Sequence, residues 1–251
     1  MKRLRIFVGW DSREDIAFRV CKHSLESHST ISLEIVPIKQ HVLRKQGLYW
    51  RPNDTLSSTE FSFTRFLTPY LAGFSGWALF VDCDFLFRKD IATLLDYLRD
   101  DKAIYCVQHK YKPSEGVKMD GQLQTVYPRK NWSSFMLMNC GHPDVGRLTP
   151  DYINTATGLE LHRFQWLSDE LIGSLPTTWN YLEGWHSSND CDDPIAVHFT
   201  RGGPWFPGWQ NVEYADEWIR LANKFGFYET DNRTAGKSDP MRNPSSYAVI
   251  K

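Results

Sequence analysis

Several features that would place the chain in a special class are missing from its sequence. The 251 residues carry a formal net charge of -1, so there is no global basic field to attract nucleic acid or an anionic membrane. No apolar run is long enough to span a bilayer. The five cysteines are widely spaced and contain no CxxC pair, which indicates reduced, mostly buried thiols. These absences favour a globular protein with no transmembrane segment and no nucleic-acid partner.

The two ends of the sequence give expectations about location and domain organisation. The first nine residues include basic side chains, but their apolar stretch is too short for a signal peptide. We therefore expect a cytoplasmic protein, with peripheral attachment to a membrane left open. Residues 231–251 are polar and contain two prolines, which predicts a loosely held tail. Because no repeat or clear linker divides residues 1–230, we expect them to form one domain.

The most informative stretch is residues 77–84. Five consecutive apolar residues, 77–81, predict a strand that is buried on both faces. Asp82 and Asp84 follow at its end, where ligands bind in open α/β sheets. Side chains at i and i+2 of an extended segment point to the same side, so both carboxylates can face one cation or one diphosphate. Divalent ions such as Mg²⁺ are held in this way by carboxylates and substrate phosphates.

The beginning of the chain predicts a β-α-β unit. Residues 4–9 and 33–38 are expected to be strands, and the apolar spacing in residues 13–26 is typical of a helix. A unit of this kind predicts an α/β fold with a parallel sheet. Asp11 lies between the first strand and the helix. It is either the helix cap or a nucleotide contact.

The remaining elements are less distinct. Residues 39–57 are expected to be loop-rich, and a helix with one apolar stripe follows from Ser57 or Ser58. Arg65 lies off that stripe and is either a solvated charge or a phosphate ligand. A helix is expected at 91–98, and the long polar segment 110–130 is typical of a binding loop. The other expected elements are strands at 103–107, 134–139 and 195–199 and a helix at 215–225.

Two later segments carry candidate site residues. Ser168 is expected to cap a helix with Asp169 and Glu170 in its first turn, where acids either offset the helix dipole or lie near a reacting centre. The strand at 195–199 carries His198. The turn that follows it, with Arg201, Gly202 and Gly203, could receive phosphate through the guanidinium and the backbone amides.

In this order, the segments resemble the GT-A glycosyltransferases, particularly the family-8-like retaining enzymes. The resemblance covers about residues 4–206. It implies a GT-A fold, in which helices flank a mostly parallel central sheet. It also implies a nucleotide-sugar donor, most often a UDP-sugar, with Mn²⁺ or Mg²⁺ bridging its diphosphate. Asp82 and Asp84 match the DxD motif of the family, and His198 matches its third metal ligand.

The resemblance also assigns donor contacts and shows departures. Asp11 matches a position near the base, and Arg65 lies in a matching segment. Asp169 and Glu170 stand where the family carries Asp-Gln beside the transferred sugar, which makes them the candidate catalytic residues. Ser134 ends a segment that replaces the usual Asn-Ala-Gly, which implies a different sugar pocket. Gly203 stands in place of the usual lysine, so the diphosphate would be contacted by Arg201 or by the amides of Gly202 and Gly203.

The expected reaction is transfer of a hexose-type sugar to an acceptor hydroxyl, with retention of configuration. The acceptor could be a glycan, a lipid-linked or a small molecule. The leaving phosphate would help to deprotonate the acceptor, or Asp169 or Glu170 would act as a covalent nucleophile. One alternative is a metal-dependent phosphohydrolase with Asp82 as nucleophile, although the usual threonine shortly after the motif is missing. Another is a non-catalytic module that binds nucleotide sugars.

Overall fold

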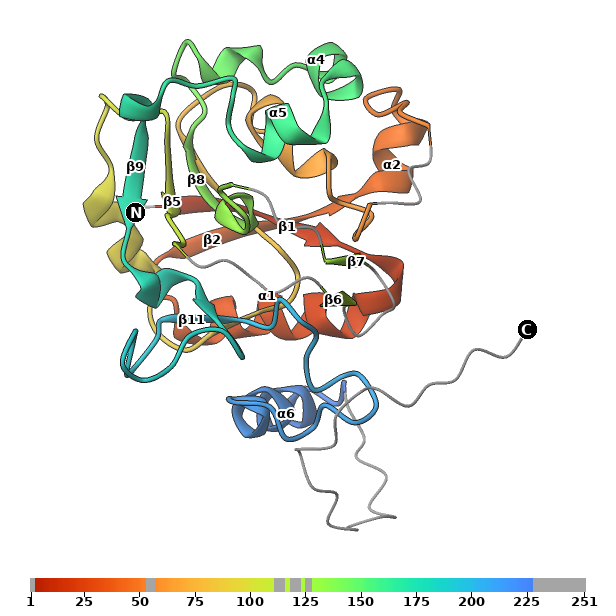
Figure 1. Ribbon diagram of the computed structural model, residues 1–251, viewed down its shortest axis with the longest axis vertical. Coiled ribbons are helices and arrows are strands. Elements are labelled where there is room, and N and C mark those ends of the chain that lie inside the picture. The colour runs from red at the N-terminus through yellow and green to blue at the C-terminus, as the bar shows by residue number, and fades with distance from the viewer. Residues whose placement is uncertain (1–2, 53–56, 111–115, 118–122, 125–127, 228–251) are drawn as a thin grey trace.

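The computed structural model is a mixed α/β fold built on one twisted sheet (Figure 1). It describes residues 3–52, 57–110, 116–117, 123–124 and 128–227. The expected tail at 231–251 and most of the polar segment 110–130 lie outside the described residues.

The central sheet has six strands, and most of their pairings are parallel. Their order is β2 (Ser32–Lys39), β1 (Arg3–Trp10), β3 (Trp77–Val81), β8 (Phe135–Asn139), β5 (Ile104–Val107) and β9 (Ile172–Leu175). The pairs β1–β2, β1–β3 and β5–β9 are parallel, whereas β8 is antiparallel to both of its neighbours. The prediction of an α/β fold with a mostly parallel sheet is confirmed.

Helices cover both faces of this sheet (Figure 1). On one side lies α1 (Asp15–His28), with α6 (Ala215–Lys224) beyond it. His23 of α1 stacks on Phe225, just after α6, with ring centroids 4.2 Å apart. The other side carries three short helices: α2 (Gln40–Lys45), α4 (Pro150–Thr155) and α5 (Gly158–His162).

A second, smaller sheet was not foreseen from the sequence. It joins β10 (Tyr181–Leu182), β11 (Ala196–His198) and β4 (Phe85–Phe87). The pair β11–β4 is antiparallel, with His198 opposite Phe85. Because of this register, a residue from late in the chain lies beside Phe85, the residue that follows Asp84 in the sequence. A two-stranded antiparallel pair, β6 (Gly116–Val117) with β7 (Leu123–Gln124), completes the strands among the described residues.

Several expected helices are shorter than predicted. The segment after Ser58 forms a 3₁₀ turn at Thr64–Leu67 and the single turn of α3 (Thr68–Leu71), in which Tyr70 is 37% exposed. The helix expected at 91–98 is a 3₁₀ helix at Ile91–Tyr97. Conversely, α2 forms within the segment that was expected to be loop. The other 3₁₀ turns are Ser12–Glu14, Trp132–Ser134, Val145–Arg147, Asp169–Leu171 and Thr177–Trp179.

The prediction of a helix that starts at Ser168 is wrong. Only a 3₁₀ turn forms at Asp169–Leu171, and β9 follows at once. Pairing with β5 overrides the local helical signal, because Ile172 and Leu175 become buried in the sheet. Gly173, a poor helix former, lies against the ring of Tyr105, and a Cβ there would come within 2.2 Å of that ring.

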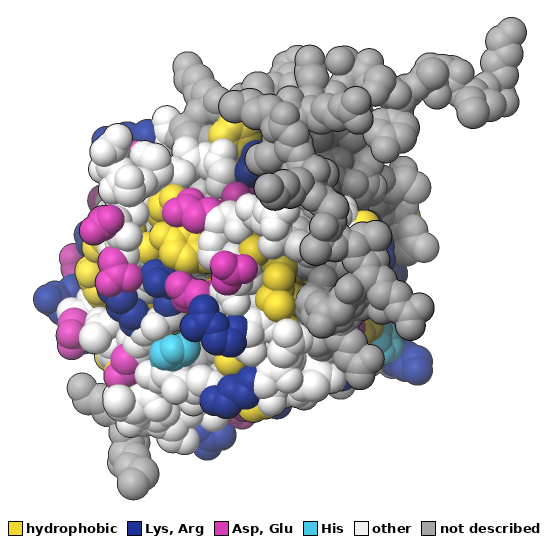
Figure 2. All heavy atoms as spheres, turned by 90° about the horizontal axis from the view of Figure 1, so that it is seen from below, with side chains coloured by type: hydrophobic (Ala, Val, Ile, Leu, Met, Phe, Trp, Pro, Cys, Tyr) yellow, Lys and Arg dark blue, Asp and Glu magenta, His cyan; other side chains and the backbone are white. Residues whose placement is uncertain are grey.

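The charged side chains and the cysteines are distributed as expected from the near-zero net charge and the spacing of the cysteines. Figure 2 shows acidic and basic side chains intermixed over the described part of the face seen from below. Among the described residues, no helix is both long and apolar enough to cross a membrane. All five cysteines are buried and free, as expected, and Cys83 is 1% exposed. Burial raises the pKa of the Cys83 thiol well above its ordinary value.

Gly9 in β1 allows an aromatic ring to lie directly on the backbone. A Cβ at this position would come within 2.5 Å of the ring of Phe61, which is itself 1% exposed. We predict that Gly9→Ala lowers the free energy of unfolding by about 1–3 kcal/mol, the usual cost of overpacking a core. Urea unfolding measures this. Gly146→Ala is the control, because a Cβ there meets nothing within 4 Å, and a loss as large in that variant would contradict the packing argument.

Candidate metal and nucleotide site

The end of β3 places its acidic residues at an edge that several elements share. Val81 pairs with Val8 of β1, so Asp82 lies at the same edge as the residues that follow β1. The amide of Asp82 donates to the carbonyl of Ser134 (3.0 Å), and the carbonyl of Asp84 accepts from the amide of Phe199 (3.0 Å). The backbone of the Asp-Cys-Asp stretch is thereby fixed to both sheets.

Asp82, Asp84 and His198 form one cluster. Each offers one ligand atom, and these atoms all lie within 4.8 Å of one another. Nε2 of His198 lies 3.3 Å from Oδ1 of Asp84. The structure thus brings together the three residues that the sequence analysis assigned to a metal. Two carboxylate oxygens and one imidazole nitrogen are donors that suit a divalent ion such as Mn²⁺.

The orientation of His198 is set by a chain of buried hydrogen bonds. Ser134 donates its hydroxyl to the carbonyl of Asn131 (2.7 Å), and its oxygen accepts from Nδ2 of Asn180 (2.9 Å). Asn180 therefore presents its Oδ1 to Nδ1 of His198 (3.0 Å). With the proton at Nδ1, the neutral ring directs the lone pair of Nε2 toward the carboxylate of Asp84. Two lone pairs that face each other repel unless a proton or a cation lies between them, and this geometry fits a metal ion.

Arg65 is a buried residue and not the solvated charge considered from the sequence. It is 5% exposed, and its Nη1 lies 2.8 Å from Oδ1 of Asp82. The same nitrogen donates to the carbonyl of Ser133 (2.9 Å). The guanidinium also lies 5.2 Å from the ring centroids of Phe61 and Phe80. Its observed partner is thus a carboxylate, and its contact with a phosphate stays a prediction.

A neutral histidine is linked to this arginine through Ser133. The hydroxyl of Ser133 lies 2.7 Å from Nδ1 of His162. Burial, assisted by the charge of Arg65, lowers the pKa of His162 to about 3. A second positive charge therefore does not form beside Arg65 at ordinary pH.

Asp11 is fully buried, and both of its oxygens are bonded within the protein. Oδ1 accepts from the amide and Nε of Arg13 (2.9 and 3.0 Å), and Oδ2 accepts from Nη2 of Arg13 (2.8 Å) and the amide of Glu60 (3.0 Å). Burial raises the pKa of Asp11, but these hydrogen bonds outweigh it and hold the pKa below its usual value. Asp11 therefore caps the 3₁₀ turn Ser12–Glu14 and not α1 itself, whose N-cap is Glu14, and the predicted nucleotide contact stays a prediction.

Arg201 is held by a buried acid that the sequence did not single out. Its Nη2 lies 3.2 and 3.3 Å from the two carboxylate oxygens of Glu183, which is 4% exposed. Burial raises the pKa of Glu183 and outweighs the opposing effect of Arg201. The guanidinium lies against the backbone of Gly184, where a Cβ would approach Nη2 within 1.6 Å. Glu183 and Arg201 are 18 positions apart, so no local pattern signals the pair.

The two glycines after Arg201 have structural roles. Gly202 has a φ of 121°, which an L side chain rarely adopts, and its amide donates to the carbonyl of Phe199 (2.7 Å). At Gly203, a Cβ would come within 2.1 Å of the ring of Trp205. The amide of Gly202 is therefore already bonded. Whether either glycine contacts a phosphate stays a prediction.

The structure does not bring Asp169 and Glu170 together with the metal cluster. They precede β9, which runs parallel to β5, so they lie where these strands begin. Asp82 and Asp84 lie at the opposite edge, where β3 ends. Asp169 pairs with Nη2 of Arg129 (2.6 Å), and its side chain is 79% exposed. The catalytic role assigned to these acids stays a prediction, and the cluster described above is complete without them.

Comparison with known proteins identifies the family of the chain. No protein-family model matches it. Protein CDI of Arabidopsis thaliana is 56% identical over 235 residues, which cover 92% of this chain and 90% of that protein. The chain belongs to the Protein CDI family.

Solved structures share the fold of this CDI-family chain at low sequence identity. The bifunctional glycosyltransferase WbbM aligns with a TM-score of 0.63 and 14% identity, covering 87% of this chain and 49% of WbbM. GlyE of Streptococcus pneumoniae TIGR4 has a TM-score of 0.60 and 14% identity, covering 88% and 60%. The galactosyltransferase LgtC has 0.52 and 12%, covering 88% and 96%. These likenesses confirm the GT-A fold expected from the sequence, and the chain spans about half the length of WbbM.

The Arg65–Asp82 pair gives a stability prediction for this CDI-family chain. Arg65→Met removes the buried cation that lies 2.8 Å from the Asp82 carboxylate, which is 14% exposed. We expect a loss of about 3 kcal/mol in the free energy of unfolding, toward the lower end for a buried pair. The control Arg3→Met breaks the exposed pair with Glu34 and should cost about 1 kcal/mol or less. Equal losses in urea unfolding would show that Asp82 does not need Arg65.

Proposed function

We propose that the chain is a metal-dependent glycosyltransferase that moves a hexose-type sugar from a UDP-sugar to an acceptor hydroxyl with retention. The observation that carries the proposal is the cluster of Asp82, Asp84 and His198 at the end of β3. Clusters of this composition suit a divalent ion that is shared with substrate phosphates. The fold is that of WbbM, GlyE and LgtC, which are glycosyltransferases by name. The acceptor would be a glycan, a lipid-linked or a small molecule.

The charge of the site supports the requirement for a cation. Asp82 and Asp84 contribute two negative charges, and Arg65 offsets one of them. A cation bound between these carboxylates would offset their repulsion of a diphosphate. A Mn²⁺ or Mg²⁺ ion held by the two aspartates and His198 would act as a Lewis acid on the departing diphosphate.

The residues of the chain would fix the positions of the reacting groups. Asn180 holds the ring of His198, and Arg65 holds the carboxylate of Asp82. Arg201 would contact the diphosphate from the turn after β11. Glu183 fixes its guanidinium in advance, so little side-chain freedom is lost on binding. The leaving phosphate would help to deprotonate the acceptor on the same face of the sugar.

The metal and donor assignments are tested together by ligand-induced thermal stabilisation. With UDP or a UDP-sugar at about 100 times its dissociation constant and Mn²⁺ present, we expect Tm to rise by about 5–10 °C. The rise should vanish with EDTA and in Asp84→Asn, which removes one ligand. The control Asp192→Asn changes an exposed acid outside the cluster and should keep the full shift. A shift that persists with EDTA or in Asp84→Asn would overturn the metal-diphosphate assignment.

An activity assay on the same protein tests whether binding of the donor leads to reaction. Release of UDP from a UDP-sugar in the presence of Mn²⁺ and candidate acceptors would show turnover. Metal-dependent binding without UDP release over long incubation would favour the non-catalytic module. A phosphoenzyme formed on Asp82 would favour the phosphohydrolase instead.

Glu183 gives a prediction about donor affinity. Glu183→Gln removes the charge that holds Arg201, so we expect the dissociation constant for UDP with Mn²⁺ to rise about five- to tenfold, as for loss of one charged hydrogen bond. Arg201→Gln should have a similar effect, and the double variant should be little worse than either, because the two residues act as a unit.

Glu217→Gln is the matched control for this experiment. It breaks a comparable two-bond pair with Arg88 (2.8 and 3.0 Å) that joins α6 to the residue after β4. Donor affinity should be unchanged in this variant. Additive losses in the Glu183 and Arg201 variants, measured by titration calorimetry, would show that Glu183 does not act through Arg201.

A further inference from the structure

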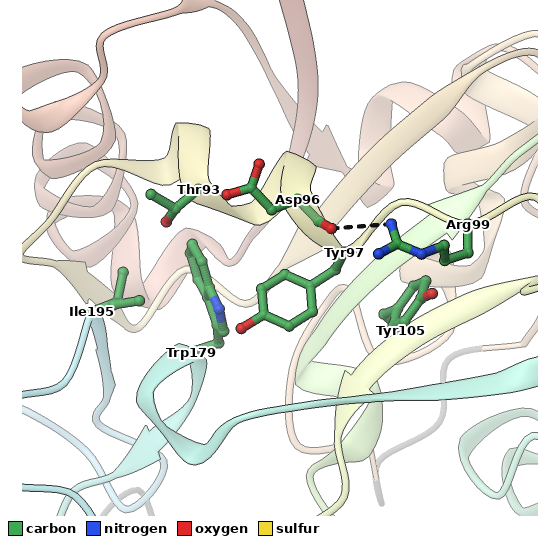
Figure 3. A pocket seen from close by; sticks show the side chains of 7 residues that line it. All are labelled: Thr93, Asp96, Tyr97, Arg99, Tyr105, Trp179 and Ile195. Carbon is green, nitrogen blue, oxygen red and sulfur yellow. Dashed lines mark hydrogen bonds between the residues drawn. The ribbon is translucent and has the colours of Figure 1, made fainter.

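A second pocket lies apart from the metal cluster, beside the 3₁₀ helix Ile91–Tyr97 (Figure 3). Its volume is about 420 Å³, within the usual range for ligand pockets. Three aromatic side chains line it: Tyr97, Tyr105 and Trp179. Asp96 and Arg99 supply charged groups. None of these residues belongs to the donor site described above.

The aromatic walls are fixed before any ligand arrives. Trp179 is 1% exposed, and its ring lies 6.0 Å from that of Phe135 in the core. Tyr105 is 7% exposed and lies directly on the backbone of Gly173. Because these rings are packed into the core, they form a fixed part of the pocket wall. Such pre-organisation lowers the entropic cost of binding.

The polar groups at the pocket are balanced in charge. The carboxylate of Asp96 is exposed and accepts no hydrogen bond from any side chain or amide among the described residues. Arg99 folds back and donates Nη1 to the carbonyls of Asp96 (3.2 Å) and Leu98 (2.8 Å), and Figure 3 shows the first of these bonds. Its remaining N–H groups can donate to a ligand. One acid and one base give no net attraction for a multiply charged anion.

We infer that this pocket binds a neutral pyranose saccharide. A sugar ring has an apolar C–H face that packs on an aromatic ring and hydroxyls around its rim. Tyr97 is half-buried and offers an apolar face, while Tyr105 and Trp179 line the pocket with only a small exposed surface. The carboxylate of Asp96 accepts from hydroxyls, and the guanidinium of Arg99 donates to them. An entirely apolar ligand would leave both charged groups without partners, and a nucleotide would meet no excess of positive charge.

The pocket and the metal cluster are connected by two consecutive residues of the chain. Trp179 is followed directly by Asn180, whose amide oxygen holds Nδ1 of His198. The indole faces the pocket, while the next side chain faces the cluster. The saccharide site is nevertheless independent of the proposed reaction, since none of its contacts involves the metal or the donor.

The inference is tested by saturation-transfer NMR on the full chain with EDTA present, which silences metal-dependent donor binding. The probes are maltose, cellobiose, lactose, mannobiose and xylobiose. We expect at least one to bind the wild-type protein, and binding to weaken about tenfold or more in Tyr97→Ala, which removes a stacking surface. Asp96→Asn should weaken the same disaccharide.

Two further variants separate the pocket from the fold and from the donor site. Thr93 is exposed and lines the pocket, so Thr93→Trp should block the pocket while Tm changes little. Asp84→Asn, which alters the metal cluster, should bind the disaccharide as the wild type does. The inference is overturned if no disaccharide binds the wild-type protein, if Thr93→Trp binds normally, or if Asp84→Asn abolishes binding. None of these outcomes depends on UDP binding or transfer.

Discussion

The rest of the site depends on how two carboxylates are tolerated at the end of a buried strand. Charged groups removed from water are costly unless they are paired or bound to a metal. Asp82 is 14% exposed and paired with a buried arginine, whereas Asp84 is 17% exposed and faces an imidazole nitrogen. Nε2 of His198 lies 3.3 Å from Oδ1 of Asp84, and a cation held between these two atoms would be stabilised by both.

Both sheets are needed to build this geometry. The central sheet ends β3 beside β1 and β8, and the 3₁₀ turn just before β8 supplies the carbonyls that anchor Asp82 and Arg65. The small sheet supplies His198 through the antiparallel register of β11 against β4. A slip of one residue in that register would turn the imidazole to the opposite face. The stacking of His198 on Phe85, with ring centroids 4.4 Å apart, helps to fix the register.

The sequence predicted those parts of the site that local patterns encode. The apolar run before Asp82 and the β-α-β start predicted the shared edge, because strand burial and parallel pairing follow from hydrophobic pattern and connection length. The small sheet, the burial of Arg65 and the Glu183–Arg201 pair were not predictable in this way. Each joins residues that are distant in the chain, and nothing in the spacing of an arginine distinguishes a buried ion pair from a solvated charge. The error at Ser168 has the same origin, since pairing with β5 decided the structure of residues that locally favour a helix.

The segment from Trp179 to Tyr181 shows how closely the two sites are joined. The indole of Trp179 faces the aromatic pocket, Asn180 bonds to His198 and Ser134, and the hydroxyl of Tyr181 donates to Glu213 (2.7 Å). Three successive side chains thus serve three different surroundings, at the point where the 3₁₀ turn Thr177–Trp179 gives way to β10. The local conformation of residues 179–181 therefore positions side chains of both the metal cluster and the pocket, although no side chain is shared between them.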